Sequence, residues 1–387
     1  MNTTAEIDDG GYHGTVPPPM EPPPRSKRHW IDQPADLVAA VRHMLELPLL
    51  AIDVEFVAAR PSDTSSIPRL ALIQIADAHQ CWVIDALQLY DLTPLNDVFT
   101  DPRIMKIFQG IGSDLPVLAI RNVYVDYVVD LEAISRSIFG SRESGLQAMF
   151  QRACNMWLDK SLQRSDWTQR PLPTAMFAYA ARDAEVTLAV YQWLCKHFDW
   201  AIPLYEDHTE DPTLEELVAP WLAVFIQGER TFPSEFIDMK QGIPSSEQLT
   251  IDCLDALDVI IRPIWRARVL RAAADLALKG IIPETLASLQ APGAEERSAA
   301  VRALGRLRAV DHLADIETAL HDPVFDVRNS AVAALEQVGL PARIGRFDRH
   351  EPVPANEPAV EEEIDAPWKS KLRDMLPPAT DDTDGTQ

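Results

Sequence analysis

The sequence predicts an α/β domain with a mixed sheet over residues 30–200, followed by an all-α region of helical repeats over residues 261–349. In the first region, strand-like segments come first and are then interleaved with helix-like segments, as in mixed sheets. In the second, Ala-rich segments led by Arg266, Arg297 and Arg328 recur 31 residues apart. Proline-rich or acidic composition predicts disordered tails over residues 1–29 and 350–387.

The composition sets bounds on the function. The 387-residue chain carries a net charge of −24, which argues against a uniformly basic nucleic-acid coat. It does not exclude nucleic acid, because bound metal ions can invert the local field. Four scattered cysteines without paired spacing predict free thiols and a cytoplasmic protein. We expect no signal peptide, no membrane span and no membrane partner, since no apolar run reaches about 18 residues.

Apolar patterning places the elements in order. Strands are predicted at 49–56, 70–77, 80–86, 103–110 and 123–130, with the second and third joined as a hairpin at Ala78 and His79. Helices are predicted at about 131–139, 144–155 and 173–197, which contain no run of helix breakers. An acidic connector over 201–260 has its clearest helix at 214–225.

The repeats read as helix pairs. Segments 281–290 and 312–322 lie between the Arg-led helices and match second helices, so that each pair buries its apolar face only against its neighbours. The pattern resembles HEAT-type repeats, and a generic three-helix bundle is the alternative. Such repeats could bind a protein partner. Arginines at equivalent repeat positions are expected to pair with acids inside the stack, as Arg328 could with Asp322 or Asp326, and others could guide RNA.

Two carboxylates share one face of the first predicted strand, "AIDVEF". Because side chains alternate along a strand, Asp53 and Glu55 point one way, opposite to Ile52 and Val54. Such a pair is stable if a cation lies between the two groups or if water reaches them at a solvated edge. The apolar flanking residues 47–59 favour a central strand, and hence the cation.

Further acids are found where apolar or capping residues would be ordinary. Asp183 interrupts the apolar stripe of helix 173–197, four residues after Tyr179, so that both lie on one helix face. Asp114 follows a predicted strand, where Ser113 or Asp114 could simply cap a helix. Oxygen ligands without a histidine or cysteine cluster favour Mg²⁺ or Mn²⁺ over Zn²⁺. The Tyr179 hydroxyl could orient or deprotonate a water molecule.

The motifs "DVE" (53–55), Asp114 and "YAARD" (179–183) resemble the DEDD 3′–5′ exonucleases of the Tyr-containing subgroup, and ribonuclease D in particular. The segments "PRLALIQIAD" (68–77), "GLQAMFQ" (145–151) and "KSLQRSDWTQRPLP" (160–173) support this resemblance over about residues 30–200. It implies a ribonuclease H-like fold and two metal ions. By that likeness Asp53 bridges both ions, Glu55 and Asp183 serve the ion that activates water, and Asp114 serves the other.

The sequence departs from the family at three places. Val54 replaces the small polar residue that often stands between the first two acids, but it points to the opposite side of the strand and should not disturb metal binding. Gln109 stands where the family often has histidine before the third acid. The repeats stand where helical nucleic-acid-binding domains usually follow in ribonuclease D, so substrate choice cannot be inherited.

A single-stranded 3′ end would need stacking and phosphate contacts near the acids. The candidates lie in or near the segment 160–170, and for each the alternative is a surface charge or a packed ring. They are Arg69, Lys160, Arg164, Trp167 and Arg170.

Three functions are compatible with these features. The first is a metal-dependent 3′–5′ exoribonuclease that removes nucleoside monophosphates by two-metal-ion hydrolysis, for example in tRNA or small-RNA processing. The second is the same chemistry on DNA, as in DNA maintenance. The third is a catalytically weak exonuclease-like scaffold that binds proteins through its repeats.

Overall fold

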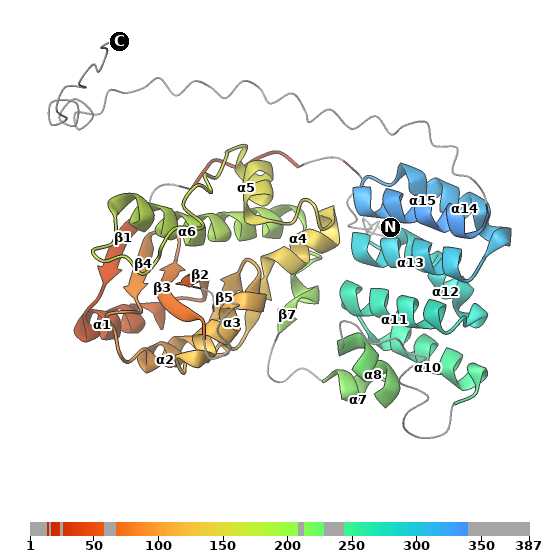
Figure 1. Cartoon of the computed structure of the whole chain (residues 1–387), viewed down its shortest axis with the longest axis horizontal. Coiled ribbons are helices and arrows are strands. Elements are labelled where there is room, and N and C mark those ends of the chain that lie inside the picture. The colour runs from red at the N-terminus through yellow and green to blue at the C-terminus, as the bar shows by residue number, and fades with distance from the viewer. Residues whose placement is uncertain are drawn as a thin grey trace, which may run out of the picture. The chain divides into compact units, whose positions relative to one another are not determined.

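The computed structural model describes residues 14, 17–23, 26–57, 67–207, 213–227 and 244–339. In these residues a seven-stranded sheet has the order β1-β4-β3-β2-β5-β6-β7, and Figure 1 shows helices on both of its faces. The strands are β1 Lys27–Ile31, β2 Leu49–Val57, β3 Arg69–Ala76, β4 Gln80–Asp85, β5 Met105–Phe108, β6 Val128–Asp130 and β7 Glu206–Asp207.

The sheet is mixed, as predicted. Strand β3 pairs antiparallel with both β2 and β4, and the β3–β4 connection is the predicted hairpin. Strands β2, β5 and β6 run parallel to one another, and β1 runs parallel to β4. The parallel neighbours β5 and β6 are joined through helix α3, Ile111–Ile120, which is the kind of crossover that parallel strands require.

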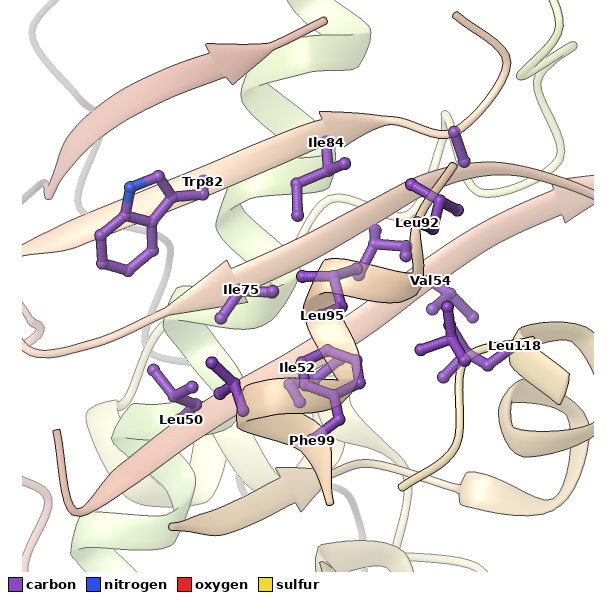
Figure 2. Close-up of a cluster of buried hydrophobic side chains, with 14 of the residues drawn as sticks. Leu50, Ile52, Val54, Ile75, Trp82, Ile84, Leu92, Leu95, Phe99 and Leu118 are labelled. Atoms are coloured by element: carbon purple, nitrogen blue, oxygen red, sulfur yellow. The ribbon is translucent and has the colours of Figure 1, made fainter. Parts of the chain in front are cut away.

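One face of the sheet carries a large apolar core. The side chains of Ile52 and Val54 point into it from β2, together with Ile75 of β3 and Ile84 of β4 (Figure 2). Three helices cover this face with buried residues such as Phe99. They are α1 Pro34–Met44, α2 Asn96–Phe99 and α3 Ile111–Ile120, with the short turn η1 Thr93–Leu95 between α1 and α2.

The opposite face is covered by later helices. The long helix α6, Thr174–His197, packs against β2, β3 and β4. Its C-terminal half joins α4 Leu131–Phe139 and α5 Leu146–Cys154 in a second core around Trp193 and Phe150. The predicted helices 131–139, 144–155 and 173–197 are therefore confirmed to within two residues.

The prediction that residues 1–29 form a disordered tail is wrong for the described residues from Pro18 onward, which contact the domain. The Met20 N–H donates to the Ala153 carbonyl over 2.7 Å, and the Trp193 indole donates to the Pro18 carbonyl over 3.2 Å. Arg28 in β1 makes a bidentate ion pair with Glu185 of α6. A proline-rich segment can be bound by a domain through its carbonyl groups, because only its N–H donors are missing.

Two other predicted elements are shorter than expected. The strand predicted at 123–130 covers only Val128–Asp130, because Tyr127 has a left-handed φ of 50° that interrupts the extended backbone. The helix predicted at 214–225 is divided into α7 Leu214–Leu217 and α8 Pro220–Gln227. Proline disfavours helical backbone at the residue before it and fits best in the first turn of a new helix.

The C-terminal described part is helical, and the short helices α12 and α14 contact the long helices α13 and α15 that follow them. The helices α11, α13 and α15 stack in that order (Figure 1). The helices are α10 Ser246–Val259, α11 Pro263–Asp275, α12 Ile282–Ala287, α13 Ala294–Arg306, α14 Leu313–Thr318 and α15 Phe325–Gln337. Short turns precede and follow α12 and α14, at Lys279–Ile281, Ser288–Gln290, Val310–His312 and Ala319–His321.

The repeat-leading arginines hold this stack together. Arg266 pairs with Glu296 of the next unit at 2.8 Å, and Arg297 pairs with Asp322 at 2.8 Å. Arg328 instead donates to two main-chain carbonyls, those of Asp322 and Pro323. The expected pairing inside the stack is therefore confirmed for two of the three arginines.

Two expectations concern other parts of the chain. The predicted tail at 350–387 lies outside the described residues. Among the residues that the structure describes, no helix is both long and apolar enough to cross a membrane.

Gly305 offers a test of the helix stack. A Cβ atom at this position would lie 2.6 Å from the Ala334 Cα atom of α15, so Gly305→Ala must push α13 and α15 apart. We expect a loss of about 1–3 kcal/mol in the free energy of unfolding, as is usual for overpacking. Gly112→Ala in α3 is the control, because its Cβ would meet nothing within 4 Å. If urea unfolding shows Gly305→Ala to be as stable as Gly112→Ala, the close helix contact is wrong.

Candidate active site

Strand β2 directs two acids toward helix α6. Asp53 and Glu55 alternate with the core residues Ile52 and Val54, so they occupy the opposite face of the sheet. The register of β2 against β3 shifts directly after Glu55, a bulge of the kind that re-aims side chains next to active sites. Asp183 of α6 completes the cluster, and one carboxylate oxygen from each of the three acids lies within 4.8 Å of the others.

Helix α6 comes close to the sheet because its contact positions are small. Ala180 and Ala184 are fully buried against residues of β3 and β4. Asp183, one position from Ala184, is consequently only 8% exposed, and its Oδ1 atom has no hydrogen-bond partner. The predicted apolar stripe of α6 is therefore real, and Asp183 interrupts it where the stripe passes Asp53 and Glu55.

Burial and mutual repulsion shift the pKa values of these acids upward. Burial is the main cause at Glu55, where the pKa rises to about 9 with further contributions from Asp183 and Asp114. The pKa of Asp53 is raised well above its usual range, again by burial first and then by Asp183 and Glu55. Burial raises the pKa of Asp183 to about 7, opposed by a hydrogen bond from Tyr179 and by the charge of Lys160.

Asp114 reaches the same neighbourhood from the next strand. It lies in the first turn of α3, which follows β5 through Gly110. Gly110 has a φ of 87°, and its N–H donates to the Asp130 carboxylate over 2.8 Å. Burial raises the pKa of Asp114 to about 6. Asp114 is not part of the three-acid cluster, but its charge acts on both Asp53 and Glu55.

The capping explanation for Asp114 is wrong. The residue at the N-cap of α3 is Gly110, four positions earlier, and neither Ser113 nor Asp114 caps the helix. The Ser113 hydroxyl donates to the Asp114 carboxylate over 2.9 Å instead.

The cluster fits a divalent cation. Its donors are all carboxylate oxygens, which are the ligands preferred by Mg²⁺ and Mn²⁺. A buried carboxylate oxygen without a partner, such as Asp183 Oδ1, is costly unless a cation or hydrogen-bond donor satisfies it. Asp53, Glu55 and Asp183 could therefore hold one ion, and Asp114 together with Asp53 could contribute to a second.

Tyr179 lies one helical turn before Asp183 and is half-buried. Its hydroxyl forms a hydrogen bond with the Asp183 carboxylate, and burial together with the charge of Asp183 raises the pKa of the phenol. The Trp167 ring packs at 5.9 Å from the Tyr179 ring and restricts its motion. A phenol that keeps its proton can orient water by hydrogen bonding, which favours that role over deprotonation.

The predicted substrate contacts divide into two groups. Lys160 is near enough to Asp183 to lower its pKa, and Arg69 and Arg164 are exposed. The prediction is wrong for Trp167 and Arg170. Trp167 is 2% exposed and belongs to the core, so its faces cannot stack on a base. Arg170 is held by both oxygens of Asp85, at 2.6 and 2.7 Å, and by the Ala71 carbonyl.

Gln74 is a site residue that sequence reasoning missed. It pairs directly with Asp53 across the antiparallel strands β3 and β2, so the two side chains share one face. It is completely buried, yet neither its amide oxygen nor its amide nitrogen has a hydrogen-bond partner. The available signal was a lone polar residue in the apolar strand "LALIQIA".

The pH dependence of stability tests the carboxylate cluster. Glu55 ionises near pH 4.3 in an unfolded chain and at about 9 in the folded protein. The folded state therefore loses stability as the pH rises through this interval, and Glu55→Gln removes the loss. In EDTA, we expect the variant to gain Tm over wild type at pH 8.5, by about 2–4 °C per kcal/mol relieved, with little gain at pH 4.5.

Glu317→Gln serves as the control for this experiment. Glu317 is exposed on α14, away from the cluster, and should change Tm by less than a degree at either pH. If burial of the acids did not destabilise the folded protein, the difference in Tm between Glu55→Gln and wild type would be the same at both pH values. That result would contradict the prediction.

Gln74→Leu tests whether its amide serves the site. Leucine removes two unpartnered buried polar atoms and so should not lower the Tm of the metal-free protein. We expect weaker Mn²⁺ binding in a calorimetric titration, because Asp53 loses its polar neighbour. Unchanged Mn²⁺ affinity would mean that Gln74 plays no part in the site.

Sequence comparison gives an independent result for the same region. A family model described as "3'-5' exonuclease" matches residues 28–199. Ribonuclease D of Pseudomonas paraeruginosa is 30% identical over 163 residues, which are 42% of this chain and 42% of that protein. Ribonuclease D of Escherichia coli is 32% identical over 41% of each chain. Exosome complex component 10 of Homo sapiens is 32% identical over 42% of this chain and 18% of its own length.

Solved structures are also similar. The catalytic core of RRP6 from Trypanosoma brucei aligns with 20% identity and a TM-score of 0.41, over 82% of each chain. The curated relatives named above are matched over less than half of their own length. Residues 28–199, which carry the four acids and Tyr179, therefore match a 3′–5′ exonuclease domain and are similar to ribonuclease D.

Proposed function

We propose that the chain is a metal-dependent 3′–5′ exoribonuclease that releases nucleoside monophosphates from single-stranded RNA 3′ ends. The observation that carries this proposal is the convergence of Asp53, Glu55 and Asp183 within 4.8 Å, beside Tyr179. Desolvated acids of this kind have no structural benefit that would offset their repulsion. Their arrangement is useful if it binds divalent ions.

The acids divide into two ligand sets in this proposal. Asp53, Glu55 and Asp183 would hold one ion, and Asp53 and Asp114 the other, with Mg²⁺ or Mn²⁺ as the metal. Two bound ions supply a nucleophile at neutral pH and a clamp for the oxygens of the displacement.

The chain's own side chains would orient the reactants. Tyr179 donates its hydroxyl hydrogen to the Asp183 carboxylate. Its oxygen would accept a hydrogen bond from the attacking water molecule and so fix the position of that water next to Asp183. Trp167 keeps the Tyr179 ring in place by packing against it. Lys160, whose charge already acts on Asp183, would attract the phosphodiester, and the exposed Arg69 and Arg164 would contact phosphates further along the strand.

RNA is favoured over DNA by the relatives, which are named as ribonuclease D. We propose tRNA or other small RNA as substrates in the cytoplasm, in line with described cysteines that are all free thiols. DNA remains the second candidate, because carboxylates that bind metal do not contact the 2′-hydroxyl. We further propose that the helix pairs α11/α12 and α13/α14 are HEAT-like repeats, supported by their 31-residue spacing.

The activity test uses 3′-labelled single-stranded RNA and DNA of one sequence, with Mg²⁺, Mn²⁺ or EDTA. Wild type should release mononucleotides from RNA with either metal and none in EDTA. Asp53→Ala and Asp183→Asn should lower the rate at least 10³-fold, since each removes a metal ligand. Glu317→Gln, far from the cluster, should retain the wild-type rate.

Three outcomes would contradict the proposal. No product with any metal would leave the exonuclease-like scaffold as the better account. Product release that Asp53→Ala does not affect would place the activity elsewhere. Faster hydrolysis of DNA than of RNA would replace the RNA substrate with DNA.

A further inference from the structure

The stacked helices α11, α13 and α15 present one common face (Figure 1). Because the repeat is 31 residues long, positions that differ by 31 form rows across the stack. The row near the helix starts holds Ile264, Glu295 and Asp326. The row two turns later holds Arg271, Arg302 and Ala333.

A groove of about 830 Å³ runs along this face. We call it the arginine groove, because the residues that line it in the described part of the chain include five arginines and only two carboxylates. The five are Arg136, Arg268, Arg271, Arg302 and Arg306. Its lining therefore carries a net charge of +3, within a protein whose total is −24.

The positive charge is concentrated at one end of the arginine groove. Near the helix starts, Glu295 pairs with Arg136 at 2.9 Å, and Asp326 accepts from the Ser141 N–H and hydroxyl. At the other end, Arg271 and Arg306 share the single carboxylate of Asp275.

The arginines at the basic end remain accessible. The Arg271 side chain is 51% exposed and lies 3.9 Å from Asp275. Arg302 is exposed and donates through Nε to the Ser330 hydroxyl, which leaves its charge uncompensated by that contact. By contrast, the repeat-leading Arg266 and Arg297 are paired inside the stack. Arg271 and Arg302 are thus available for a ligand, and their planar guanidinium groups suit phosphate.

Helix α4 connects the arginine groove with the acids. It begins at Asp130, whose charge raises the pKa of Asp114 and whose carboxylate accepts from Gly110. It ends at Phe139, and the next two residues, Gly140 and Ser141, line the groove. Its nine residues span about 14 Å, and the basic row lies about 10 Å further along the stacked helices. A strand that followed both helices would need up to about seven stacked nucleotides at roughly 3.4 Å each.

We infer that the arginine groove binds the phosphate backbone of the RNA upstream of its 3′ end. The inference rests on the proposed function, since it supplies the path by which a substrate leads to the acids. It explains why exposed arginines gather on one face of the repeats in an otherwise acidic chain. RNA long enough to reach the basic row should be held by it, and a trinucleotide should not reach it.

The test compares Arg271→Glu/Arg302→Glu with Lys279→Glu/Arg308→Glu. Both double variants make the same charge change on exposed residues of the helical region, but Lys279 and Arg308 do not line the groove. Binding of a labelled 20-nucleotide single-stranded RNA is measured in EDTA by fluorescence anisotropy. Hydrolysis of that RNA and of a trinucleotide is measured with Mn²⁺, and circular dichroism checks folding.

We expect the groove variant to bind the 20-mer at least 10-fold more weakly than the control variant. The slope of log affinity against log salt should fall by about 1.4, the value for two lost phosphate contacts on a single strand. The kcat/KM for the 20-mer should fall in parallel, while the loss for the trinucleotide is less than 2-fold.

Equal affinity of the two double variants for the 20-mer would overturn the inference. An acidic protein segment would then be the better candidate ligand for the groove. An equal loss on trinucleotide and 20-mer would also overturn it, because the damage would then lie in the catalytic domain. Failure of the proposed function is a separate result: wild type would then hydrolyse neither RNA, whatever its binding in EDTA.

Discussion

The repulsion between desolvated carboxylates is the constraint on which the rest of the exonuclease domain depends. Asp53, Glu55 and Asp183 lie close together at low exposure. Their pKa values rise because burial penalises ionisation, and at Asp53 and Glu55 the neighbouring negative charges add to this effect. The domain holds them together by apolar packing on the other side of the sheet, where Ile52 and Val54 anchor β2 (Figure 2). Stability from that core offsets strain at the site, as expected for functional centres.

Much of the fold follows from local sequence patterns. The alternation in β2 and the apolar stripe of α6 are strong periodic signals, and they place Asp53, Glu55, Tyr179 and Asp183 correctly. Strand β1 and helix α1 were not predicted. The segment "KRHWI" of β1 is an edge strand with charged residues, so its sequence lacks a strong apolar pattern. Its Arg28 pairs with Glu185, which is 157 residues away in the sequence. Contacts of that separation are not encoded in local periodicity.

The substrate residues show a second limit of sequence reasoning. Trp167 and Arg170 have the composition of a nucleic-acid contact, but the fold uses them as support. Whether an arginine is free or paired depends on a partner such as Asp85, which only tertiary structure reveals. Gln74 is the opposite case, a site residue that the sequence does not reveal. A polar residue in an apolar strand can be assigned to the site only once the strand register places it opposite Asp53. The same holds for the arginine groove, whose rows combine one residue from each stacked helix.

The most direct test of this account is calorimetric titration of Mn²⁺ into the metal-free protein at pH 7.5, in two buffers with different ionisation enthalpies. Glu55, with a pKa of about 9, is protonated at this pH and must lose its proton to become a ligand. We expect binding with release of at least one proton, and loss of that binding in Asp183→Asn. Binding without proton release, or equal binding by Asp183→Asn, would contradict it.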